Sequence, residues 1–152
     1  DAEAICRANV FLRTTERILI QIGRFHAYSF DELFEALSIR VEEINKYIDG
    51  KINNGYKVAV WGAGHQALAI ISLVDISKKI EFIIDSAEFK QGKYTPGSHV
   101  RVVSPEILKK EKIDVILVIA ASYSDEVANI IKKNYQETHI AILRSNGLEI
   151  IR

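Results

Sequence analysis

Two short segments of this sequence combine residue types that can bind an anionic ligand. The first is Gly62-Ala63-Gly64-His65-Gln66-Ala67, which has the pattern G-x-G-x-x-A. In a strand–turn–helix unit, the first glycine of this pattern allows a tight turn and the second lets a phosphate approach the backbone. The third small residue keeps the helix close to the strand. Because the first N–H groups of the helix have no partners within it, they attract an anion.

Asp85, at the end of the next predicted strand, supports this interpretation. In dinucleotide-binding folds, an acidic residue about 20 residues after the glycines accepts hydrogen bonds from a ribose. The alternative is that the small residues merely permit a tight turn and bind no ligand. Moreover, about four strands are predicted after residue 56, where a full dinucleotide fold has six. A nucleotide-like ligand is therefore easier to defend than NAD.

The second segment is the long polar stretch from Ser86 to Arg101. A loop of this length in a compact domain is usually functional or disordered. Lys90 and Lys93 could meet phosphates, and Tyr94 could stack on a base or a sugar. The alternative is an excursion of the chain over the surface that binds nothing.

Strands and helices that would position these residues alternate along the chain. Strands are predicted at 57–61, 80–84, 114–120 and 139–143, with a further short strand at 148–151, and helices at 67–74, from Ser104 onward and at 122–131. Ser104 and Pro105 have the types expected at a helix start, and Ser122 and Asp125 form a predicted capping box. The alternation predicts an α/β fold, a Rossmann-like parallel sheet of about four to five strands with flanking helices.

A long N-terminal helical segment is predicted to precede that sheet. Apolar residues between Ile5 and Ile22 recur at helical intervals. A second helix is predicted to begin with a capping box of Ser29 and Glu32 and to continue through Ile52, about six turns. We therefore expect a helical segment at 1–55 and a Rossmann-like domain at 56–152. The N-terminal helices are candidate contacts for a homo-oligomer.

Composition excludes several classes of function. The 152 residues include 20 basic and 20 acidic side chains, so no basic face for nucleic acid is implied. There is no apolar run long enough for a membrane span and no signal peptide, which makes a cytoplasmic location the expectation. The four histidines lack metal-ligand spacing. Since the sequence begins with Asp1 and contains no Met, we expect a domain of a longer protein.

Several motifs together resemble one family. The order V-x-V-W-G-A-G, I-I-D-x(4)-K-Q-G-K-Y-x-P-G, V-V-S-P-E, D-V-I-L-V and Y-S-D-E-V is similar to the C-terminal domain of sugar-nucleotide C-methyltransferases, over about Ser29 to Ile142. These enzymes methylate a carbon of a nucleotide-linked deoxyketosugar. They have a zinc-binding N-terminal domain, a central domain that binds S-adenosylmethionine, and a Rossmann-like C-terminal domain.

The resemblance implies a domain that is not catalytic alone and that forms one wall of a sugar-nucleotide cleft. It binds no cofactor or metal itself, and its partners are the nucleotide sugar and the upstream methyltransferase domain, which holds S-adenosylmethionine. The carboxyl edge of the strands would supply the ligand contacts. The candidate ligand-binding residues are Gly62, Ala63, Gly64, His65, Gln66, Asp85, Lys90, Lys93, Tyr94, Ser122 and Tyr123.

The chain departs from the family pattern at two places. Gln66 and Ala67 stand where the family tends to have lysine and glycine, and Ala121-Ser122 precede Tyr123 where tryptophan and asparagine are usual. Losing the lysine removes a charge that could pair with a phosphate, so either the ligand differs, or Lys90 and Lys93 take that role, or the site has decayed. Two other functions compete with this one. They are a small NAD(P)-binding module of an oxidoreductase, and a non-catalytic domain whose long helices mediate assembly.

Overall fold

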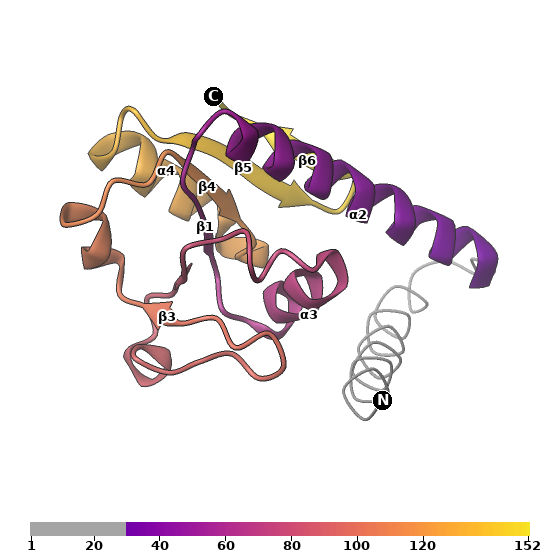
Figure 1. Cartoon of the computed structure of the whole chain (residues 1–152), viewed down its shortest axis with the longest axis horizontal. Coiled ribbons are helices and arrows are strands. Elements are labelled where there is room, and N and C mark those ends of the chain that lie inside the picture. Colours follow the sequence, from indigo (N-terminus) through magenta and orange to yellow (C-terminus); the bar gives the residue numbers. More distant parts are fainter. Residues whose placement is uncertain (1–29) are drawn as a thin grey trace.

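The computed structural model describes residues 30–152. It forms a three-layer α/β fold around one six-stranded sheet (Figure 1). Its helices are α2 Phe30–Asn53, α3 His65–Val74 and α4 Ser124–Asn134, its 3-10 turns η1 Glu88–Lys90, η2 Pro105–Lys109 and η3 Ala121–Tyr123, and its strands β1 Val58–Trp61, β2 Ile83–Ile84, β3 Val102–Val103, β4 Val115–Val118, β5 His139–Arg144 and β6 Gly147–Ile150. The predicted first helix and the capping residue Ser29 lie outside the described residues.

The strand order is β3-β2-β1-β4-β5-β6, with β6 antiparallel to β5 and every other pair parallel. The chain moves outward from β1 to β3 on one side and then returns to place β4 on the other side of β1. This is the Rossmann-like order, and it confirms the predicted fold class. The sheet has six strands rather than the predicted four to five, so the strand count does not argue against a dinucleotide. The point where the order reverses lies between β1 and β4.

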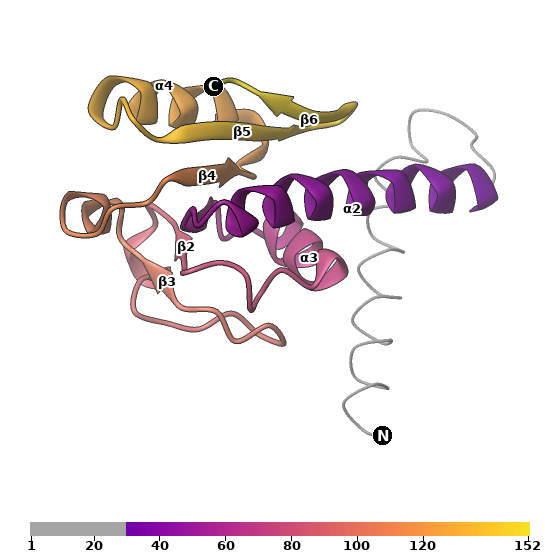
Figure 2. The ribbon, with the colours of Figure 1, turned by 45° about the horizontal axis from the view of Figure 1, so that its top comes forward.

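Both faces of the central strands β1 and β4 are buried, which suits their uninterrupted apolar sequences. On one face, Val58 and Val60 of β1 pack in a cluster with α2 and α3, and on the other, Ala59 and Trp61 pack in a cluster with α4. Figure 2 shows α2 and α3 together on one side of the sheet and α4 on the other. Trp61 is 3% exposed, so it is a core residue rather than a surface for stacking a ligand.

Helix α2 confirms the second predicted helix and extends beyond the sheet. Ile44 and Ile48 are fully buried in the core. Further toward its N-terminus, Arg40 donates to the carbonyl of Ser145 in the β5–β6 turn. The turns of α2 before Arg40 continue roughly 15 Å farther at about 1.5 Å per residue. In both views they extend past the carboxyl ends of β4 and β5 (Figures 1 and 2).

The sequence did not predict β3, and the stretch before it is more ordered than a surface excursion. The Gly92 N–H donates to the Val102 carbonyl at 2.9 Å, and the Val102 N–H donates to the Lys93 carbonyl at 2.8 Å. Tyr94 forms an antiparallel bridge with Arg101. The segment therefore folds back as a hairpin against the chain that enters β3. None of the helices within residues 30–152 has the length and apolarity that a membrane crossing needs.

Candidate functional site

The glycine turn follows β1 at the point where the strand order reverses. Gly62 has φ +124, which side chains rarely adopt. A Cβ built on Gly62 would lie 2.1 Å from the carbonyl oxygen of Ile119, which directly follows β4. The backbones that leave β1 and β4 therefore touch at this position. Glycine at position 62 is required by the fold itself, whether or not a ligand binds.

Gly64 is a different case, because neither its backbone nor its packing requires glycine. Its φ is −80, and a Cβ built there would meet no atom of residues 30–152 within 4 Å. Gly64 is the N-cap of α3, which has no side-chain cap. The first N–H groups of α3 thus lack intrahelical partners, and they carry the positive end of the helix dipole. His65 and Gln66, in this first turn, are exposed. The arrangement can accept an anion against the backbone.

Asp85 follows β2 and fastens the glycine turn to the long loop. Its Oδ2 accepts from the Ala63 N–H at 2.7 Å and from Lys90 Nζ at 3.0 Å, and its Oδ1 accepts from the Ala87 N–H at 2.9 Å. Burial alone would raise the pKa of the Asp85 carboxyl. The hydrogen bonds from Ala87, Ala63 and Lys90 outweigh burial, and the pKa is lowered. Asp85 is therefore an ionised carboxylate whose negative charge is already balanced by a lysine.

The structure separates the two lysines of the predicted phosphate contact. Lys90 pairs with Asp85, and its ammonium lies 5.7 Å from the ring centroid of Phe89. Lys93 is exposed on the hairpin. The ammonium of Lys90 must leave Asp85, or share it, before it can contact a phosphate. The proposed replacement of the missing family lysine by Lys90 or Lys93 stays a prediction.

Tyr94 lies on the amino side of β3 rather than at its carboxyl end. It pairs with Arg101, the residue before β3 begins, and its ring stacks on His99 with centroids 4.7 Å apart. The buried Thr95 fixes the turn that follows, since its Oγ1 accepts from the Val100 N–H at 2.8 Å. Tyr94 is 56% exposed. Any stacking of a base on Tyr94 would use the ring face opposite His99.

Ser122 and Tyr123 lie in η3, the turn that follows β4. Both are exposed, and Tyr123 is 67% exposed. Because the backbone after β4 touches Gly62, this turn borders the glycine turn across the reversal point of the sheet. The structure thus brings two predicted groups to one edge: residues 62–66 from β1, and Ser122 with Tyr123 from β4.

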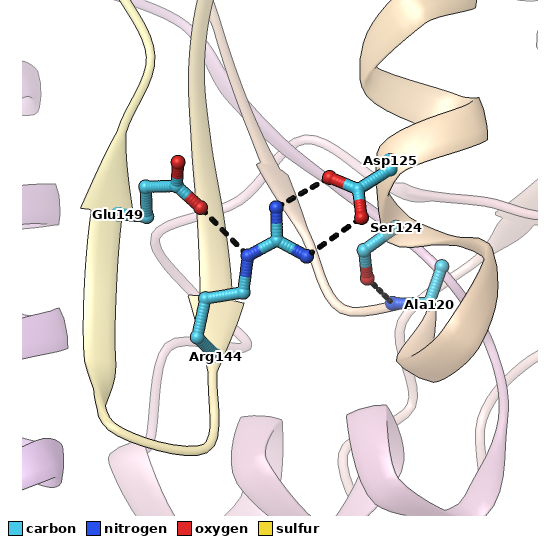
Figure 3. Close-up of polar contacts among 5 residues, drawn as sticks. All are labelled: Ala120, Ser124, Asp125, Arg144 and Glu149. Atoms are coloured by element: carbon cyan, nitrogen blue, oxygen red, sulfur yellow. Dashed lines mark hydrogen bonds and ion pairs between the residues drawn. The ribbon is translucent and has the colours of Figure 1, made fainter.

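The predicted capping box of Ser122 and Asp125 is wrong. The N-cap of α4 is Tyr123, without a side-chain cap. Ser124, rather than Ser122, closes the turn by accepting from the Ala120 N–H at 3.2 Å. Asp125 instead accepts two hydrogen bonds from Arg144 (Figure 3). The Ser104 prediction is correct, since its Oγ accepts from the Glu106 N–H at 3.3 Å. The helix that Ser104 caps, however, is the short 3-10 turn η2.

Arg144 also lies at this edge, and none of the sequence motifs includes it. It is the last residue of β5, and its guanidinium contacts Asp125 and Glu149. A charged residue that ends an apolar parallel strand was the signal that could have identified it. Within residues 30–152, no group of three or more His, Cys, Asp or Glu side chains is arranged to hold a metal ion.

Comparison with solved structures agrees with the fold. The chain is similar to the crystal structure of UDP-D-quinovosamine 4-dehydrogenase from Vibrio fischeri, with a TM-score of 0.50 and 14% identity. The match covers 64% of this chain and 93% of that chain. At this identity the similarity shows the fold alone.

Two curated proteins match parts of the sequence. C-methyltransferase NovU of Streptomyces niveus is 30% identical over 86 residues, which are 56% of this chain and 20% of NovU. The putative RNA methyltransferase YpsC of Bacillus subtilis (strain 168) is 63% identical over 35 residues, which are 23% of this chain and 9% of YpsC. This chain thus spans a fifth or less of the length of either relative.

The family comparison covers most of the chain. The model of the C-methyltransferase C-terminal domain matches residues 21–143. This range includes the glycine turn, Asp85, the hairpin and η3, and it confirms the resemblance found in the sequence motifs. The chain belongs to the family of C-methyltransferase C-terminal domains.

Proposed function

We propose that this chain is the sugar-nucleotide-facing domain of an S-adenosylmethionine-dependent C-methyltransferase. The substrate would be a nucleotide-linked deoxysugar, and the chain would not be catalytic alone. Membership of the family supports the assignment to a C-methyltransferase. The proposed parts are the substrate class, the methyl donor and which domain binds each of them.

The observation that carries the proposal is the open backbone at Gly64. This glycine lies at the uncapped start of α3, and no atom of the domain occupies the space above its Cα. In open α/β sheets, ligands bind outside the carboxyl ends of the strands, where the strand order reverses. A diphosphate suits this place, because partnerless N–H groups and the helix dipole both favour an anion.

The opposite turn offers groups suited to a neutral sugar. Ser122 has an exposed hydroxyl that can donate and accept, and Tyr123 presents an exposed aromatic ring with a polar tip. Tyr94 and Lys93 lie farther along the loop after β2 and could contact the distal part of a long ligand. In the proposed enzyme, Asp85 and Lys90 hold the loop against the glycine turn rather than bind directly.

Helix α2 supports a cleft shared with an upstream domain. Its N-terminal turns run past the same carboxyl edge that carries the glycine turn and η3 (Figure 2). A domain joined to that end of the helix would face the site, and S-adenosylmethionine bound there would supply the methyl group. This chain contains no E/D-x-G-x-G donor-binding loop. We therefore assign donor binding and acid–base chemistry to the upstream part of the protein.

An NAD(P)-binding module is the second candidate, favoured by the G-x-G-x-x-A turn. The contacts of Asp85 weigh against it. A ribose-binding carboxylate needs free acceptor positions, yet Asp85 already accepts three hydrogen bonds and is paired with Lys90. Fluorescence of Trp61, the only tryptophan, discriminates between the two candidates. Quenching by NADH at micromolar concentration would favour the dinucleotide.

An assembly domain is the third candidate, and the exposure of α2 is the observation in its favour. Ile39 is 60% exposed on the part of α2 that extends from the domain. Homo-oligomer contacts through the N-terminal helices would cover such a residue. Light scattering of the chain is the test, and a purely monomeric result across a wide concentration range would contradict this candidate.

The test of the leading proposal is ligand binding by the full-length protein. UDP-glucose, dTDP-glucose and GDP-glucose would be titrated while the melting temperature is followed. A ligand at 100 times its Kd stabilises a protein by about 2.7 kcal/mol, which corresponds to a rise of several degrees for domains of this size. Transfer of a labelled methyl group from S-adenosylmethionine should require the full-length protein and should be absent with this chain alone.

The matched variant is Gly64→Ala. The structure leaves room for the new Cβ, so the melting temperature should change little. If a phosphate approaches the backbone at this point, the added methyl group should weaken nucleotide-sugar binding roughly tenfold, about 1.4 kcal/mol. The proposal fails if no nucleotide sugar shifts the melting temperature of the full-length protein. Equal affinities of Gly64→Ala and wild type would show that the ligand does not bind against the start of α3.

A further inference from the structure

The turn between β4 and α4 has a backbone conformation that requires support. Ala121 has φ +50, in the left-handed region that residues other than glycine rarely adopt. Such conformations persist only where surrounding contacts hold them, and they concentrate at ligand sites. Ser122 and Tyr123 follow directly, so the conformation of Ala121 decides where these two candidate ligand contacts point.

Two sets of side-chain contacts hold the end of this turn (Figure 3). Inside, the Oγ of Ser124, which is 1% exposed, accepts from the Ala120 N–H. Outside, the guanidinium of Arg144 donates to both oxygens of Asp125, at 2.5 and 3.2 Å. Arg144 also donates from Nε to Glu149 at 2.7 Å. The start of α4 is thereby joined to the end of β5.

The strand that carries Arg144 is itself fixed. β5 pairs with β4 and with β6, and the Leu148 N–H in β6 donates to Glu43 of α2 at 3.2 Å. Arg144 therefore joins the start of α4, next to the turn, to a strand that is paired on both sides. An isolated ion pair on a surface contributes little to stability. A guanidinium that donates to both oxygens of one carboxylate, as Arg144 does to Asp125, fixes direction as well as distance.

The turn is also in contact with the glycine turn. The Ile119 N–H donates to the Trp61 carbonyl at 2.9 Å. The carbonyl of Ile119 lies so close to Gly62 that no Cβ would fit between them. A shift of the chain after Ile119 would therefore disturb residues on both sides of the site.

We propose that Arg144 and Asp125 are positioning residues of the nucleotide-sugar site. They hold the turn at 120–124 in the conformation that presents Ser122 and Tyr123 to the ligand. This inference rests on the proposed function for its ligand. Neither residue contacts the ligand in this proposal. They act on binding by keeping the turn in one conformation before the ligand arrives.

The test compares three variants of the full-length protein. Asp125→Asn and Arg144→Lys each weaken the link to the turn. Glu149→Gln is the matched control, because it weakens a contact of the same guanidinium on the side away from the turn. Hydrogen exchange of residues 120–124 is measured without ligand, and the Kd of UDP-glucose, dTDP-glucose and GDP-glucose is measured by calorimetry.

We expect faster exchange at 120–124 in Asp125→Asn and Arg144→Lys, with exchange elsewhere unchanged, and no change in Glu149→Gln. If the released turn spends about a tenth of its time in the competent conformation, the Kd rises roughly tenfold. Melting temperatures should stay close to wild type in all three variants, which separates positioning from loss of fold.

The outcomes distinguish the two proposals. Unchanged exchange at 120–124 in Asp125→Asn overturns the positioning role, whatever ligand the protein binds. Faster exchange with an unchanged Kd overturns the link between the turn and binding, as does an equal rise of Kd in Glu149→Gln. If wild type binds none of the nucleotide sugars, the proposed function fails, and the ligand assigned to this turn fails with it.

Discussion

The substitution Gly62→Ala tests the claim that the fold, and not only a ligand, requires the first glycine of the turn. Two costs add in the folded state. Holding alanine at φ +124 costs roughly 1–3 kcal/mol. The new Cβ would meet the Ile119 carbonyl oxygen at 2.1 Å and its carbon at 2.8 Å, both backbone atoms. Relieving that overlap by separating the backbones after β1 and β4 costs about another 1–3 kcal/mol.

We therefore expect the free energy of unfolding to fall by about 2–6 kcal/mol. That is a large part of the roughly 5–15 kcal/mol of an ordinary domain. Urea denaturation followed by Trp61 fluorescence measures the change. Gly50→Ala is the control, because Gly50 lies in α2 and a Cβ built on it would meet no other part of the described chain within 4 Å. It should stabilise the protein by roughly 0.5–1 kcal/mol. A cost for Gly62→Ala below about 1 kcal/mol would refute the reasoning.

Three further substitutions test other parts of the structure. Asp85→Asn should destabilise the protein by about 1–3 kcal/mol at pH 7. Because the folded pKa of Asp85 lies below the ordinary value of 3.8, this difference should hold above about pH 4 and shrink as the pH falls further, measured by urea denaturation at several pH values. Thr138→Val removes a buried 3.0 Å donor to the Ile113 carbonyl and should cost about 1 kcal/mol in the same assay. Ile116→Ala, at a fully buried position, should cost roughly 2–5 kcal/mol by thermal or urea denaturation. A pH-independent Asp85→Asn difference, or costs near zero for the other two, would contradict these assignments.

The sheet could be predicted because its central strands carry their own signal. Val115–Val118 is apolar without interruption, and the structure buries all four residues between two helical layers. Helix α2 could be predicted for a similar reason, since its apolar stripe continues over several turns. In long segments, the spacing of apolar residues shows which faces are buried, so the sequence alone predicts the element.

The strand β3 could not be predicted, because it is too short to show a periodic pattern of apolar residues. Val102 and Val103 are only two residues, and they follow a long polar stretch. They become a strand by pairing with Ile83 and Ile84 of β2, which are distant in the sequence. The hairpin bonds of Gly92 and Lys93 are backbone bonds, which leave no side-chain pattern to read.

The capping box shows a different kind of failure. Ser122 and Asp125 have the correct types and spacing for the motif. Asp125, however, lies near Arg144, and a bidentate bond to a guanidinium is stronger than a bond to a backbone amide. A pattern of neighbouring residues cannot reveal that a side chain from a distant strand, here Arg144, binds the carboxylate instead. The same holds for Asp85, whose type suggested a ribose ligand and whose partners turn out to be two amides and a lysine.

The two glycines of the turn separate the requirements of the fold from those of a ligand. Gly62 is explained in full by φ +124 and by the contact with Ile119. Gly64 has an ordinary φ and open space, so the structure alone gives no reason against alanine beyond a small preference for glycine at an N-cap. A matched pair of alanine variants therefore divides the two roles. Loss of stability at position 62 with intact stability and weakened binding at position 64 is the result that the proposed site requires.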